Sequence, residues 1–164
     1  MEEFLFLAII ALLKDVIGKY LAALAIRKDE MVLTDFYEIK TGEVTGRKVD
    51  GYPALFITPS GDNSFSETIS YTMNEAPLQT YRYQIVMLIE GDDYEELELR
   101  AMRYREAIKE MFKANYTLGG VALGCRITST DIHTVVASDG GELEHGSRMN
   151  LDIIAPEFIS SFNK

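Results

Sequence analysis

The chain has few of the residues that cross-link or interrupt a fold. Its 164 residues include one cysteine, four prolines, two histidines and no tryptophan. A single cysteine, Cys125, excludes an intrachain disulfide, so nothing indicates an oxidising compartment. It lies in the apolar run at residues 121–125, which predicts a buried and unreactive thiol. No proline-rich linker divides the chain, and its length fits one domain over residues 1–164.

Basic residues are in the minority: 16 Lys and Arg stand against 26 Asp and Glu, a net charge of −10. This balance disfavours binding to DNA through a basic surface, since phosphate contacts need clustered Lys and Arg. An acidic ring can nevertheless surround DNA and let it slide, because like charges repel. An ordinary acidic cytosolic protein has the same composition, so the charge leaves both readings open.

No hydrophobic run is long enough to cross a membrane. Residues 4–13 are continuously apolar, but Glu2 and Glu3 precede them where a signal peptide carries basic residues. Lys14 and Asp15 end the run well short of the about 20 residues that a membrane helix needs. We therefore expect neither a signal peptide nor a membrane anchor.

The usual signatures of catalysis and cofactor binding are missing. The sequence has no GxGxxG, GxxxxGK[ST], HExxH or CxxC motif, so nucleotide, zinc-protease and thiol-redox functions lack their local motifs. Ser129, Asp131 and His133 have the residue types of a hydrolytic triad, but no GxSxG turn presents the serine. Closeness in sequence is also not the geometry that a triad needs. We predict no catalytic site, no cofactor and no bound metal.

The cluster most like a set of metal ligands is Asp139, Glu142, Glu144 and His145. Its carboxylates would suit a hard cation. Their spacing matches no known metal-binding loop, and acidic loops are common. We therefore interpret this stretch as a solvated hairpin loop between Val136 and Met149.

What the sequence does contain is the segment order of an α+β domain. A helix at residues 1–27 precedes a polar connection at 28–50, an α+β core at 51–156 and a short tail at 157–164. Apolar runs predict strands at residues 52–58, 79–90, 121–130 with 133–137, and 148–155, and a weaker strand at 31–37. Residues 64–76 alternate loosely and predict an exposed arm or hairpin.

The first helix is more apolar than one core-facing side requires. Its predicted stripe repeats every three or four residues and consists of Leu5, Ile9, Leu12, Val16, Tyr20 and Leu24. Phe4, Phe6, Leu7 and Ile10 add apolar side chains on its other sides. This surplus indicates either deeper burial within the domain or contact with a neighbouring subunit.

The main helix is predicted at residues 93–114. Asp92 with Glu95, or Asp93 with Glu96, has the spacing of a capping box, and Asn115 fits the C-terminal cap. The side facing the sheet is predicted to consist of Leu97, Ala101, Tyr104, Ile108, Met111 and Phe112. The charged residues predicted to cover its outer surface are Arg100, Arg103, Arg105, Glu106, Lys109 and Glu110.

Several short segments follow one another in a distinctive order. They are YPALFITP at 52–59, YQIV at 83–86, the two aspartates before the main helix, and NYTLGG at 115–120. This order resembles the tail-terminator and tail-completion proteins of tailed bacteriophages. The leading helix and the final strand also fit, so the resemblance covers most of residues 1–156. It implies an α+β fold with a mixed or antiparallel sheet and helices packed on one face.

The resemblance also implies a structural role. Such proteins form a ring, typically of six subunits, at the head-proximal end of the tail tube. The ring stops tube growth and offers a surface for head–tail joining. The implied partners are other copies of the chain, the tail tube protein, and the head–tail connector or head-completion protein, while DNA passes through the lumen. The implied location is the virion tail, with the host cytoplasm during assembly.

Residues with loop, edge or surplus apolar character are the candidates for subunit or docking contacts. They are Phe4, Phe6, Leu7, Asp62, Asn63, Glu67, Tyr71, Asp139, Glu142, Glu144, Phe158 and Phe162. Other hypotheses remain: a different phage neck or head-closure protein, and a small-molecule or peptide-binding α+β module. A further alternative is a metal-dependent hydrolase using Asp131, His133, Asp139, Glu142 and His145.

Overall fold

The computed structural model describes residues 2–27, 31, 33–42, 49–60, 78–137 and 143–156, with the backbone alone at 133–137. The predicted arm at 64–76 and the tail at 157–164 lie outside these residues. The same holds for the candidate contact residues Asp62, Asn63, Glu67, Tyr71, Asp139, Glu142, Phe158 and Phe162.

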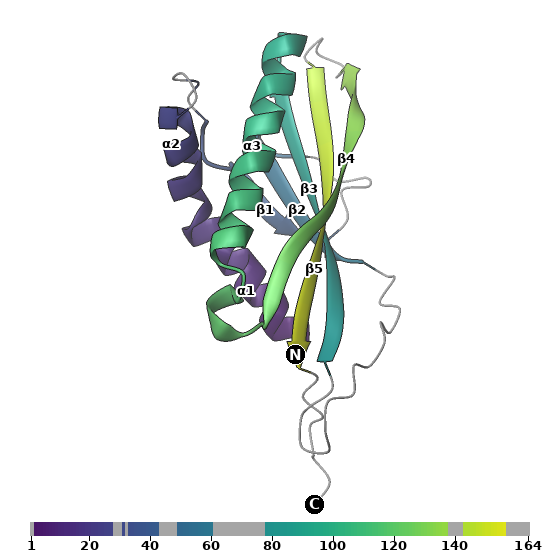
Figure 1. Ribbon diagram of the computed structural model, residues 1–164. Coiled ribbons are helices and arrows are strands. Elements are labelled where there is room, and N and C mark those ends of the chain that lie inside the picture. The colour runs from purple at the N-terminus through teal and green to yellow at the C-terminus, as the bar shows by residue number, and fades with distance from the viewer. Residues whose placement is uncertain are drawn as a thin grey trace, which may run out of the picture.

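The described chain is an α+β domain, as predicted, and its sheet is five-stranded and mixed, one of the two sheet types expected. Its elements are α1 (Glu2–Asp15), α2 (Ile17–Arg27), β1 (Glu38–Thr41), β2 (Ala54–Pro59), β3 (Leu78–Gly91), α3 (Tyr94–Ala114), the 3-10 turn η1 (Leu118–Gly120), β4 (Gly124–Ala137) and β5 (Leu143–Pro156). The strand order is β1-β2-β3-β5-β4, with β1 parallel to β2 and the other pairs antiparallel. Figure 1 shows the three helices on the same side of the sheet.

The core lies between the sheet and the helices α1, α2 and α3. Alternate side chains of β3 point toward the helices, and Tyr83, Ile85 and Met87 are buried there. The predicted stripe of α3 is buried against them, which confirms the assignment of Leu97 and Phe112 to the core. The prediction failed on the same helix for Arg103 and Arg105, which are buried rather than on the surface.

Both ends of α3 are capped as predicted. The carboxylate of Asp93 accepts a hydrogen bond of 2.8 Å from the backbone N–H of Glu96, and the N–H of Asn115 donates to the carbonyl of Met111. The chain then turns through Gly119 and Gly120, whose φ angles of 72° and 91° favour glycine. Local sequence chemistry therefore fixes where this helix begins and ends.

The N-terminal segment is two helices, not one. A turn at Val16 separates α1 from α2, and the buried row is Leu5, Ile9, Leu13, Ile17, Leu21 and Leu24. The predicted row was therefore wrong at Leu12, Val16 and Tyr20, which are only half-buried. Just after the turn, a Cβ on Gly18 would lie 2.9 Å from an oxygen of Asp35, so glycine allows the following segment to pack closely.

Several strand predictions also need correction. The described residues 31 and 33–37 do not form the predicted weak strand; the short strand is β1, which pairs with β2 and lies inside the predicted polar connection. β4 is one strand whose register shifts at Ile127/Ser129 and His133/Val136. β5 begins at Leu143, so Glu144 and His145 belong to a strand and not to a solvated loop.

The sheet side without helices is divided into two parts. Near β2, the side chains of Ala54, Phe56 and Leu88 are buried under Val49 and Tyr52. Farther along β3, β5 and β4, most side chains on this side are polar and at least partly exposed, with Ile154 as an apolar exception. Among the described residues, no helix is both long and apolar enough to cross a membrane.

Candidate interaction surface

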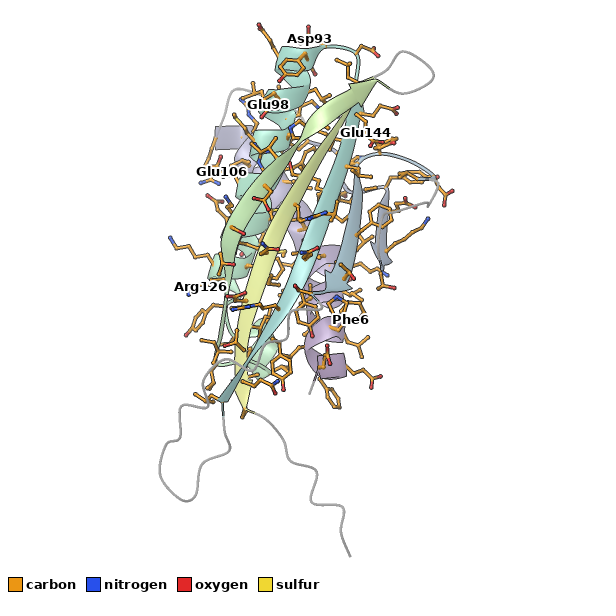
Figure 2. The ribbon with its side chains drawn as sticks, turned by 90° about the vertical axis from the view of Figure 1, so that its right-hand side faces the viewer. Phe6, Asp93, Glu98, Glu106, Arg126 and Glu144 are labelled. Atoms are coloured by element: carbon orange, nitrogen blue, oxygen red, sulfur yellow. The ribbon has the colours of Figure 1, made fainter. Side chains whose placement is uncertain are left out.

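The polar part of the helix-free side carries three arginines on three neighbouring strands. Because side chains alternate along a strand, the residues between the buried ones point away from the helices. Asp152 of β5 pairs in register with Arg82 of β3 and with Arg126 of β4. Arg148 lies on the same side of β5, four residues before Asp152. We call Arg82, Arg126 and Arg148 the arginine face; Figure 2 looks onto it, with Arg126 labelled.

These arginines have few acidic partners. Arg82 Nε is 3.6 Å from Asp152 Oδ1, and the Arg82 side chain is 40% exposed. A pair this long and this exposed to water contributes little to stability. Within the described part of the chain, Arg126 and Arg148 form no ion pair, and the buried Nε of Arg148 has no hydrogen-bond partner. Arg126 is exposed and Arg82 is partly exposed, so their guanidinium groups can reach carboxylates of another molecule.

Amide and hydroxyl groups surround the arginines. Asn150 Nδ2 donates to Ser129 Oγ over 2.7 Å, and Thr128 Oγ1 donates to the carbonyl of Asn150. The register shift between Ile127 and Ser129 brings Ser129 opposite Asn150. A shallow cavity of about 280 Å³ opens beside Arg82 and Asn150. Such a surface can hold polar and anionic groups through several hydrogen bonds.

A second charged surface lies at the beginning of α3. Asp92, Glu95 and Glu96 are exposed there, while Asp93 serves as the cap. None of these three exposed carboxylates forms an ion pair with another described residue, and we call them the acidic helix start. Tyr94, in their midst, is 57% exposed. Figure 2 places the labelled Asp93 at one end of the molecule, away from Arg126.

The apolar residues predicted as contacts on α1 divide between core and surface. Phe6 is half-buried and stacks on Tyr83, with ring centroids 6.0 Å apart. Phe4 and Leu7 point outward and are 67% and 55% exposed. Part of the surplus on this helix is therefore internal packing, as Phe6 shows, and part is exposed surface; contact with a neighbouring subunit stays a prediction.

Glu144 is engaged within the chain. The hydroxyl of Tyr52 donates a short hydrogen bond to Glu144 Oε2, joining the segment before β2 to β5. Burial and this carboxylate together raise the pKa of Tyr52. Through this hydrogen bond, Glu144 is linked to the apolar cluster that Tyr52 covers on the helix-free side. Its role as a contact residue stays a prediction.

A buried polar cluster between α3 and β5 escaped the sequence analysis. His145 is fully buried, and its Nε2 lies 2.8 Å from Glu98 Oε2. Arg105 lies 3.7 Å from the other Glu98 oxygen and donates a hydrogen bond of 2.8 Å to Ser147 Oγ. His145 and Ser147 alternate with outward residues in step with buried Met149, so strand periodicity was the signal that could have revealed them.

The predicted ligand-like cluster is not assembled by the residues that can be described. Glu144 and His145 are neighbours in β5 and point to opposite sides of the sheet, toward Tyr52 and Glu98 respectively. Asp131 pairs with Arg148, on the side away from His145. Across the described ranges, no three His, Cys, Asp or Glu side chains come close enough to hold a metal ion.

Comparison with known proteins adds no family or relative. No family model matches the chain, and no curated protein sequence is significantly similar to it.

Proposed function

We propose that this chain is a structural ring protein of a bacteriophage tail, of the tail-terminator type. The proposal rests on the segment order that resembles this family and on the mixed sheet with helices packed on one side. In this role the ring caps the head-proximal end of the tail tube, stops its polymerisation and provides the surface for head–tail joining.

The observation that carries the proposal is the presence of two unlike surfaces on opposite sides of one domain. The helices cover one side of the sheet (Figure 1). The arginine face occupies the other side, as the strand register shows. A ring needs such a pair, because each subunit presents a different surface to each neighbour and the contacts close on themselves. The exposed Phe4 and Leu7 add apolar area that an assembly can bury.

Termination follows from the geometry of such a ring. One end of the ring copies the contacts of a tube ring and binds the last tube subunits; the other end lacks the surface that another tube ring requires. It binds the head–tail connector or head-completion protein instead. DNA passes through the lumen without specific binding, since a chain of net charge −10 does not form a strongly basic wall. No catalytic step belongs to this role.

Electron microscopy of the purified protein, paired with a mass measurement, tests the ring. We expect closed rings, with six subunits as the family resemblance implies, and particle mass that rises with protein concentration. A protein that remains a monomer at every concentration would contradict the proposal. Labelling the chain in assembled particles separates a terminator from another neck or head-closure protein, because the label should lie where the tail tube ends.

A further inference from the structure

We propose that neighbouring subunits are joined by ion pairs between the arginine face of one copy and the acidic helix start of the next. This inference rests on the proposed ring and adds which surfaces close it. The partner is a second copy of this chain, and the paired groups are Arg82, Arg126 and Arg148 on one side and Asp92, Glu95 and Glu96 on the other.

Charge complementarity selects these two surfaces. Arg126 and Arg148 have no ion-pair partner among the described residues, and Arg82 has only the long contact to Asp152. The three carboxylates of the acidic helix start are likewise exposed and without an ion pair in the described part of the chain. Guanidinium and carboxylate groups form charge-assisted hydrogen bonds, which strengthen when a contact excludes water.

The positions of the two surfaces determine the kind of assembly. The arginine face points away from the helices, while the acidic helix start belongs to the helix layer, at one end of α3 (Figures 1 and 2). A contact between them joins two different surfaces, so each subunit keeps one of each available for the next neighbour. Such heterologous contacts form a ring when the rotation closes.

Both surfaces also offer apolar area beside the charges. Tyr94 and Leu99 are 57% and 42% exposed near the acidic helix start. Ile154 is 45% exposed two residues from Asp152. Protein interfaces commonly combine buried apolar and aromatic contacts with a polar rim. The charges then orient the subunits and speed their encounter, while the apolar contacts add burial.

Salt provides the first test. The association constant of the wild-type protein can be measured by sedimentation velocity at about 50 mM and about 1 M NaCl. It should be at least tenfold lower at high salt, because salt screens the attraction between the charges. Equal assembly at both concentrations would contradict the ionic contact.

A charge exchange provides the decisive test. Arg82→Glu with Arg126→Glu should abolish assembly, as should Asp92→Arg with Glu95→Arg. An equimolar mixture of the two variants should assemble again, since every contact in an alternating ring is then complementary. Lys14→Glu with Lys19→Glu is the matched control for the arginine-face variant: it makes the same change of net charge as that variant, at exposed positions of α1 and α2, and should leave assembly unchanged. Arg126→Glu alone is the milder variant, and thermal unfolding confirms that each variant is folded.

The outcomes separate this inference from the proposed function. If the wild type forms rings and the folded variants do so equally well, or if the mixture of two non-assembling variants stays dissociated, the ionic contact is wrong and the ring remains. If the wild type never assembles, the ring itself is wrong and this inference falls with it.

Discussion

His145 Nε2 lies 2.8 Å from Glu98 Oε2, so a charged side chain of α3 meets a fully buried histidine of β5. Arg105, on the turn of α3 facing the same strand, bonds to Ser147 and lies near the second oxygen of Glu98. Most of the other buried residues of α3 are apolar. The polar cluster adds directional contacts between α3 and β5 to this packing.

The cluster predicts that removing a carboxylate from α3 lowers the free energy of unfolding more at Glu98 than at Glu95. Glu98→Gln should lower the free energy of unfolding by about 1–3 kcal/mol, because Arg105 and His145 lose the carboxylate they face. In the monomeric protein, Glu95→Gln, one turn earlier and exposed, should change it by less than about 0.5 kcal/mol. Denaturant unfolding measures both, and equal effects would show that the Glu98 contact contributes no stability.

The two histidines are predicted to have no catalytic role. Replacing His133 and His145 together with Ala should leave ring formation and tail completion intact at temperatures where the variant is folded. The buried position of His145 adds that stability should fall, since the substitution leaves a cavity beside Glu98. Complementation of tail assembly at a permissive temperature is the measurement. A folded, assembled but inactive variant would overturn the view that the protein is not an enzyme.

The core placement of α3 predicts a large difference between two phenylalanines. Phe112 is 1% exposed, and Phe112→Ala should cost about 3–5 kcal/mol. Phe4 is 67% exposed in the isolated chain, so Phe4→Ala should cost little in a monomer. Thermal unfolding of the monomeric protein compares them. An unchanged midpoint for the Phe112 variant would mean that this side of α3 has been placed wrongly.

Burial predicts a weakly reactive thiol at neutral pH. The Cys125 side chain is half-buried rather than buried as the sequence suggested, and burial raises its pKa to about 11. The folded state therefore favours the neutral thiol; this contribution to stability is present below about pH 9 and is lost as the pH rises toward 11. At pH 8, thiol-specific reagents should react about a hundredfold more slowly than in urea. Cys125→Ser is the control without a thiol. Equal reaction rates in the native and the unfolded protein would contradict the raised pKa of Cys125.

The sequence predicted most accurately what depends on neighbouring residues. The cap at Asp93 and the repeat from Leu97 to Phe112 are local, and the predicted helix agrees with α3 to within a residue. The alternation of β3 is equally local. β1 was missed because its four residues include Glu38 and Lys40, and it is a strand only through pairing with β2.

Burial of charge and assembly of a surface depend on contacts between distant parts of the chain. Arg105 was assigned to the surface because charged residues usually lie there; its burial depends on Ser147, 42 residues away. The arginine face requires β5 to lie between β3 and β4, an order that no single segment specifies. None of its three arginines was a candidate in the sequence analysis, because only the strand order places them on one surface.

The length of tail tubes assembled with and without this protein tests the central claim most directly. If the chain terminates tails, tubes made in its absence should vary in length or overgrow and should fail to join heads. Supplying the wild-type protein should restore one length and joining, whereas a folded variant that cannot form rings should not. Tubes that keep their normal length and join heads efficiently without the protein would contradict the proposed function, whatever its oligomeric state.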